Sequence, residues 1–125
     1  MVKLSGFKRE VGKQRECGAR SQERKVRITV LKLSKPGDLW GHDLPGVTSV
    51  KDACSAFAVG QQFVVDEYGH CPEGFCPHAW YDVWPWIMHL RFGGDFPWML
   101  EKGTAVVCCT DGFRPVIFKL ERIEE

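Results

Sequence analysis

Cysteine is the residue type in this chain that is best suited to chemistry. Five of the six cysteines follow residue 50. The N-terminal residues are basic but no apolar run follows them, so we expect no secretion signal and a cytoplasmic protein with reduced thiols. There, clustered cysteines more often bind metal, react as nucleophiles or fill the core than form disulfides. The five are Cys54, Cys71, Cys76, Cys108 and Cys109.

Cys76 directly precedes a predicted helix that begins at Pro77. Unpaired N–H groups and the positive end of the helix dipole stabilise a thiolate at this position. We therefore expect Cys76 to be a metal ligand or a nucleophile. Cys71 lies five positions earlier in C-P-E-G-F-C, a wider spacing than the C-x-x-C pair of most zinc sites. We favour its interpretation as an ordinary loop cysteine.

Cys108 and Cys109 are adjacent in a predicted strand, so their side chains must point to opposite faces of the sheet. The surrounding apolar pattern does not decide which of the two faces the helix. A disulfide between neighbours requires a strained ring, which argues against that pairing. Cys54 is interpreted more readily as a small buried hydrophobe than as a ligand.

Several cysteines can nevertheless share one site, because a helix start, a strand end and a loop can meet at one edge of a small sheet. Thiolate ligands favour zinc or an iron–sulfur cluster over calcium or magnesium. Arg114 follows the turn D-G-F-R; it either holds a carboxylate or phosphate near the thiols or pairs with Asp111. His78, Asp82 and His89 form a polar helix stripe, for which we favour a solvated face over a metal site.

Hydrophobic periodicity predicts the elements that position these residues. Val26, Ile28 and Val30 alternate with polar residues, as in a half-buried strand. The Asp-Gly pair at 111–112 predicts a hairpin between the last two strands. We expect a loop over 35–46 and a short helical turn over 49–56. The expected strands are 25–30, 61–66, 104–110 and 116–123, and the long helix is 77–92.

The long helix carries an apolar arc of roughly 200° when its residues are placed at about 100° intervals. A sheet covers only part of such an arc. The remainder requires the 36–57 segment, a second subunit or another partner, or a ligand. Pro85 should kink this helix or split it in two.

Composition and charge separate a tail from a body. Residues 1–27 hold nine basic and three acidic residues, whereas the whole chain of 125 residues has a net charge of +1. We expect residues 1–24 to be a disordered basic tail and residues 25–125 to be a single domain. The tail contains one aromatic residue, Phe7, so we favour a solvated tail over a nucleic-acid-binding arm. No apolar stretch approaches the length of a membrane span.

Four motifs together resemble an uncharacterised family of small prokaryotic proteins, many of them from anaerobes. They are P-E-G-F-C at 72–76, A-W at 79–80, G-G-D-F-P-W at 93–98 and C-C-T-D-G-F-R-P-V at 108–116. The resemblance covers about residues 25–125 and includes a cysteine, here Cys54, before a G-x-x-F strand. It implies that Cys54, Cys76 and Cys109 are the functional cysteines, and it supplies no established reaction.

The sequence thus predicts an α+β domain with a four-stranded, mainly antiparallel sheet and one long helix on one face, in the order strand, strand, helix, strand, strand. The leading functional hypothesis is an accessory module that binds a metal or metallocluster through Cys54, Cys76 and Cys109, with Arg114 beside them. One alternative is a small thiol redox protein or enzyme with Cys76 as nucleophile and Cys109 as resolving partner. The other is a structural protein that binds a partner or forms a homodimer through the apolar helix face. Whether the chain is an enzyme stays open.

Overall fold

The computed structural model describes residues 23–124, and an antiparallel sheet occupies its centre. The predicted α+β class, with a four-stranded sheet and one long helix, is confirmed. The predicted basic tail lies outside the described residues, apart from Glu23 and Arg24. In chain order the elements are β1 (Lys25–Leu33), α2 (Pro36–Trp40), β2 (Gln62–Val65), α3 (Pro77–Arg91), β3 (Thr104–Cys108) and β4 (Val116–Ile123).

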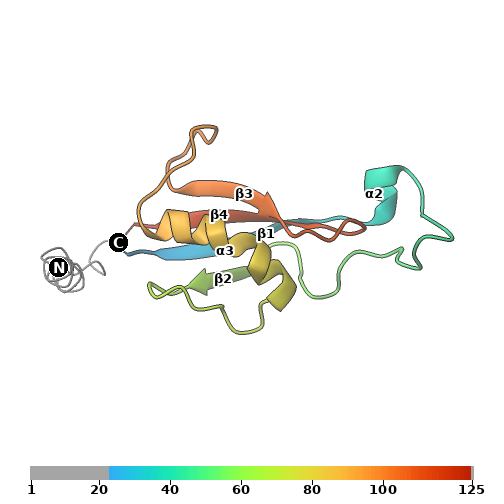
Figure 1. Ribbon diagram of the computed structural model, residues 1–125, viewed down its shortest axis with the longest axis horizontal. Helices are drawn as coiled ribbons and strands as arrows, with labels where there is room; N and C mark the ends of the chain where they lie inside the picture. The colour runs from blue at the N-terminus through green and yellow to red at the C-terminus, as the bar shows by residue number, and fades with distance from the viewer. Residues whose placement is uncertain (1–22, 125) are drawn as a thin grey trace, which may run out of the picture.

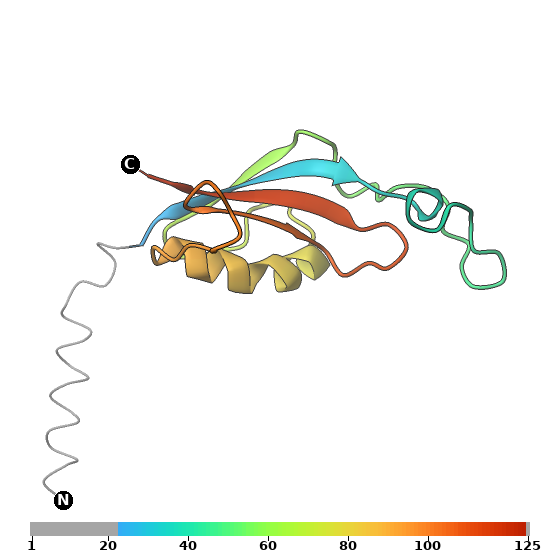
Figure 2. The ribbon, with the colours of Figure 1, turned by 90° about the horizontal axis from the view of Figure 1, so that it is seen from above.

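The sheet has the order β2-β1-β4-β3, so the first and last strands of the chain pair at its centre. The alternation predicted for β1 is confirmed, because Val26, Ile28 and Val30 are at most 1% exposed. In β4 the side chains of Phe118 and Leu120 are fully buried on the same face. This is the face on which α3 lies (Figure 2), so one apolar layer between sheet and helix forms the core.

Helix α3 has the ends that its sequence predicts. Pro77 occupies the first turn, where a backbone N–H would make no intrahelical hydrogen bond, so its absence in proline costs nothing. Gly93 follows the helix with φ of 87°, a backbone conformation that side chains other than glycine rarely adopt. The helix continues through Pro85, so the proline does not split it in two.

The buried stripe of α3 is narrower than its apolar arc. The residues of α3 that are buried against the sheet include Ala79, Val83 and Ile87. Trp86 is covered from the other side by the loop that follows the helix, with its ring centroid 5.0 Å from that of Phe96. The chain itself therefore covers part of the arc that was expected to need a partner or ligand.

Two expectations for the segment after β1 are wrong. Residues 36–40, predicted as loop, form the short helix α2. Pro36 occupies its first turn, and the side chain of Asp38 accepts a hydrogen bond from the Lys35 N–H at 3.0 Å. The helical turn predicted over 49–56 is absent; instead the Thr48 hydroxyl accepts the Val50 N–H at 3.1 Å, which closes a local turn.

The segment between α2 and β2 projects from one end of the sheet (Figure 1). Some of its apolar side chains are exposed, with Val47 at 70% and Val59 at 64%. Only its last part reaches α3: residues 54–57 and the first turn of the helix line the same small cavity. The segment 36–57 therefore does not cover the apolar face of α3.

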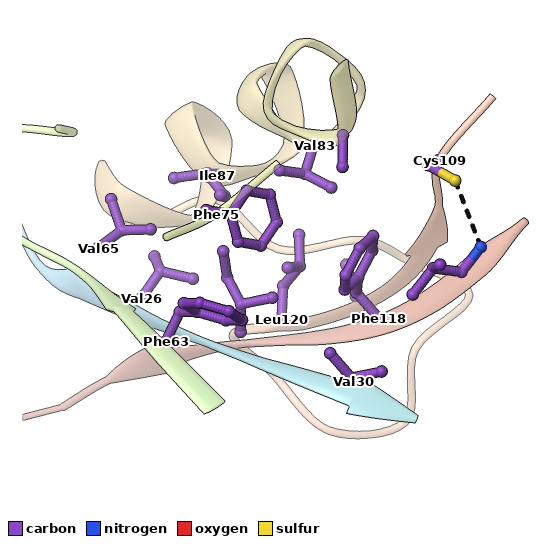
Figure 3. Packing of buried hydrophobic residues seen from close by; sticks show 14 of the residues in the cluster. Val26, Val30, Phe63, Val65, Phe75, Val83, Ile87, Cys109, Phe118 and Leu120 are labelled. Carbon is purple, nitrogen blue, oxygen red and sulfur yellow. Dashed lines mark hydrogen bonds between the residues drawn. The ribbon is translucent and has the colours of Figure 1, made fainter. Parts of the chain in front are cut away.

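Four phenylalanines of the core, Phe57, Phe63, Phe75 and Phe118, form one aromatic cluster, and Figure 3 labels the last three. Phe75 has its ring centroid 5.1 Å from Phe57, 5.0 Å from Phe63 and 5.6 Å from Phe118. The first two pairs are edge-to-face and the third is tilted; aromatic pairs contribute about 0.5–1.5 kcal/mol each beyond their buried area. Two of the four rings come from loops, so this cluster fixes those loops to the sheet.

Between residues 23 and 124, no helix has the length and apolar character needed to cross a membrane.

Candidate functional site

The cysteines favoured by the sequence lie around one hollow, which we call the inner cavity. Its volume is about 260 Å³, and it lies between the start of α3, the end of β3 and the loop before β2. Segments far apart in the sequence therefore meet here. The chemically active side chains in its wall are Cys54, Cys76, His78, Cys109, Asp111 and Arg114.

Cys76 is placed by its neighbours on both sides. It is the N-cap residue of α3, with extended backbone angles, and its carbonyl accepts the Trp80 N–H at 2.9 Å. The preceding residue, Phe75, is only 5% exposed and is held in the aromatic cluster. The position of Cys76 therefore depends on the core and not only on the helix end.

Cys54 is also held in place by a nearby buried phenylalanine. It lies three residues before Phe57, which is 6% exposed and packs in the same aromatic cluster. The Cys54 sulfur accepts a hydrogen bond from the Ala56 N–H at 3.4 Å. The thiol is half-buried. The segment between α2 and β2 therefore projects over most of its length, but its end holds Cys54 in the cavity wall.

Cys109 is the cysteine of the adjacent pair that faces the helix, which the sequence left undecided. It is 8% exposed and belongs to the core, whereas Cys108 is exposed. Its sulfur accepts the Val116 N–H at 3.3 Å (Figure 3), and its own N–H donates to the Val116 carbonyl at 3.1 Å. These two bonds hold the sulfur at the base of the hairpin.

A side chain of α3 fixes the strand end beside Cys109. The Asp82 carboxylate accepts hydrogen bonds from the Thr110 N–H at 2.8 Å and from the Thr110 hydroxyl at 3.2 Å. His78 lies 3.0 Å from the same hydroxyl through Nε2. The sequence did not predict this link. Of the expected polar stripe, His78 and Asp82 thus bind the hairpin, whereas His89 lies 2.9 Å from the Asp95 carbonyl.

Arg114 and Asp111 form an ion pair at the rim of the inner cavity, with Arg114 Nε 3.6 Å from Asp111 Oδ2. Burial opposes ionisation of Asp111, but the N–H groups of Phe113 and Arg114 and the Arg114 charge lower the pKa of this carboxyl below its usual value. Arg114 therefore both pairs within its turn and lines the cavity, so the two interpretations of this residue are compatible.

Cys71 lines a different hollow, which we call the outer cavity. This cavity has a volume of about 590 Å³, and its wall consists of Cys71, Pro77, Trp80, Tyr81 and Trp84. Tyr81 is 83% exposed, so the outer cavity is an open aromatic surface of α3. Burial, followed by the neighbouring Cys76, raises the pKa of the Cys71 thiol.

The structure thus separates the cysteines into two groups. Cys54, Cys76 and Cys109 share the inner cavity, whereas Cys71 lines the outer one and Cys108 lies on the opposite face of the sheet from Cys109. Burial and then Cys109 and Asp82 raise the pKa of the Cys108 thiol. Within the part of the chain that is described, no three His, Cys, Asp or Glu side chains are grouped closely enough to hold one metal ion.

No protein-family model, curated protein or solved structure matches this chain.

Proposed function

We propose that the inner cavity binds a soft, thiolate-ligated metal group through Cys54, Cys76 and Cys109, and that the protein acts as an accessory module for this group. The single observation that carries the proposal is that three cysteines from three separate segments line one cavity. Thiolates select zinc, copper(I) and iron–sulfur clusters over hard cations. The resemblance noted in the sequence selects the same three cysteines.

The size of the cavity favours a metallocluster over a single ion. Its volume of about 260 Å³ is several times the roughly 30 Å³ that one water molecule occupies in the liquid. A group of several atoms fits such a space, and the three cysteines in its wall would be its ligands. When bound, an iron–sulfur cluster supplies one-electron chemistry.

Backbone hydrogen bonds to two of the sulfurs support the same proposal. Cys54 and Cys109 each accept one N–H, at 3.4 and 3.3 Å. Hydrogen bonds to ligand sulfurs orient the ligands and tune the potential of a bound cluster. Arg114, at the rim, supplies a positive charge beside the thiolates and orients an anionic ligand at the cavity mouth.

The test is anaerobic purification followed by measurement of zinc, iron and acid-labile sulfide per chain. Reconstitution with ferrous iron and sulfide should give thiolate-to-iron charge-transfer absorption. Serine substitution at Cys54, Cys76 or Cys109 should abolish it, because each removes a ligand. Cys71→Ser and Cys108→Ser are the matched controls and should retain it.

Loading below about 0.2 metal per chain would contradict the proposal, because structural metal binding is coupled to folding and is strong. Equal loss of metal from all five serine variants would also contradict it. Circular dichroism on each apo variant shows whether a loss of metal reflects a lost ligand or a lost fold.

A further inference from the structure

The two cysteines of C-P-E-G-F-C flank a tight turn. The Phe75 N–H donates to the Pro72 carbonyl at 3.2 Å, which closes a four-residue turn. Gly74 has φ of 80°, the value that the third residue of a type II turn requires. The residues just outside this turn are Cys71 and Cys76.

The turn brings the two chain segments that flank it toward each other. A β-turn places its first and last Cα atoms, here those of Pro72 and Phe75, within about 7 Å of each other. Cys71 and Cys76 are the next residues outward, and a disulfide between them requires Cα atoms roughly 4.4–6.8 Å apart. A second observation agrees, because Cys71 and Pro77, the residue after Cys76, line the same outer cavity. The nearness of the two thiols is also evident from the influence of Cys76 on the pKa of Cys71.

The turn is held on both sides. Phe75 is locked in the aromatic cluster. On the other side, Asp66 accepts hydrogen bonds from the N–H groups of Tyr68 and His70, each at 3.0 Å. A loop held at both ends keeps the two sulfurs near each other, which raises their effective concentration for a reaction with each other.

We propose that Cys71 and Cys76 form a reversible dithiol–disulfide pair that exchanges with low-molecular-weight disulfides such as oxidised glutathione. This activity goes beyond the proposed metal site and does not depend on it. The outer cavity gives a disulfide of this size access to the exposed Cys71.

The exchange has two steps. The thiolate of Cys71 attacks one sulfur of the external disulfide; a protein mixed disulfide forms, and one thiolate leaves. The thiolate of Cys76 then attacks the Cys71 sulfur, so the Cys71–Cys76 bond forms and the second external thiolate leaves. Two electrons pass from the two cysteines to the external disulfide, and their two thiol protons go to the two thiols that are released.

The experiment uses the full reduced chain after metal has been removed by chelation. The protein is equilibrated with mixtures of reduced and oxidised glutathione, quenched with acid, alkylated and mapped by mass spectrometry. We expect the Cys71–Cys76 disulfide to form at oxidised glutathione concentrations about tenfold below those that glutathionylate Cys108, because the second step is intramolecular.

Three variants sharpen this result. Cys76→Ser should trap glutathione on Cys71, because the attacking sulfur of the second step is absent. Cys71→Ser should form neither the disulfide nor the mixed disulfide with glutathione at this position. Cys108→Ser is the matched control and should behave as the unaltered chain.

A first-formed disulfide between Cys76 and Cys109 would overturn the inference, as would separate mixed disulfides on Cys71 and Cys76. Because the readout is made on metal-free protein, a failure of metal binding leaves this result unaffected. Conversely, a chain that binds metal through Cys54, Cys76 and Cys109 but forms no Cys71–Cys76 disulfide refutes this inference alone.

Discussion

The inner and outer cavities both adjoin the first turns of α3, and they are built in different ways. Loops anchored in the core form much of the inner wall, because Phe57 and Phe75, close in sequence to Cys54 and Cys76, are at most 6% exposed. The outer wall consists of Cys71 and side chains of α3, and Trp84 in this wall is 44% exposed. The aromatic core therefore holds the loops of the inner cavity in place, whereas the outer cavity is open to solvent.

Removal of a core anchor should have the largest effect. Phe75→Ala deletes a buried ring that touches three others, and such substitutions cost about 3–5 kcal/mol. We expect the free energy of unfolding in urea to fall by this amount. The same variant should also increase the alkylation rate of Cys76, because the loop beneath it is released. An unchanged midpoint and an unchanged rate would show that the core does not position this cysteine.

Loss of the link between α3 and the hairpin should have an intermediate effect. Asp82→Ala leaves the Thr110 N–H and hydroxyl without their acceptor, and hydrogen bonds to charged groups contribute about 1.5–3 kcal/mol. We expect a loss of about 1–3 kcal/mol in urea unfolding, together with faster alkylation of Cys109. Asp82→Asn serves as the conservative control, since its amide oxygen still accepts one bond.

The pH dependence at the cavity rim should be smaller. The pKa of Asp111 is lowered from 3.8 in the folded state, so its contribution to stability is complete above this value and is lost as the pH falls through the lower folded pKa. The stability difference between the unaltered chain and Asp111→Asn should therefore shrink as the pH falls from neutral to about 3. A difference that stays constant would show that the Asp111–Arg114 turn does not stabilise the charged carboxylate.

Substitution at the outer cavity should have the smallest effect on stability. Trp84 is only partly covered, so Trp84→Ala should change the free energy of unfolding by less than Phe75→Ala, at most about 1 kcal/mol. If the outer cavity admits external disulfides, the same variant should slow glutathionylation of Cys71 in the Cys76→Ser background. A stability loss equal to that of Phe75→Ala would remove the distinction between the two cavities.

Periodic patterns predicted the elements that face the core. Alternation in β1 was sufficient because burial on one face of the sheet imposes it. Pro77 at the start of the long helix and Gly93 after its end were sufficient because their backbone geometry suits helix ends. The loop prediction over 35–46 was wrong for α2, although Pro36 at its start and Gly41 at its end have the same arrangement as in α3. The prolines and glycines were taken as signs of a loop when they marked the ends of a short helix.

The helix expected over 49–56 was wrong for a different reason. Ser49 and Asp52 have the spacing of an approximate capping pair, and a cap does not form a helix without an apolar face to bury. The first part of this stretch lies on the projecting segment (Figure 1), and its end, from Cys54, reaches the inner cavity.

The sequence pointed to candidate cysteines but not to the side chains that hold them in place. Its position at the helix start selected Cys76, and the resemblance selected Cys54 and Cys109; all three line the inner cavity, and their role as ligands stays a prediction. Phenylalanines close to two of them in the sequence were an available signal that these loops are anchored. The bond between Asp82 and Thr110 spans 28 positions, and no local pattern records such a contact.

The most direct test of a shared thiol site is protection of each cysteine by a reconstituted metallocluster. The reduced chain is alkylated before and after reconstitution with ferrous iron and sulfide, and the rate at each cysteine is read by mass spectrometry. We predict slower alkylation of Cys54, Cys76 and Cys109 together after reconstitution, with unchanged rates at Cys71 and Cys108. Protection of Cys71 in place of Cys109, or equal rates at all five positions, would contradict the proposed site.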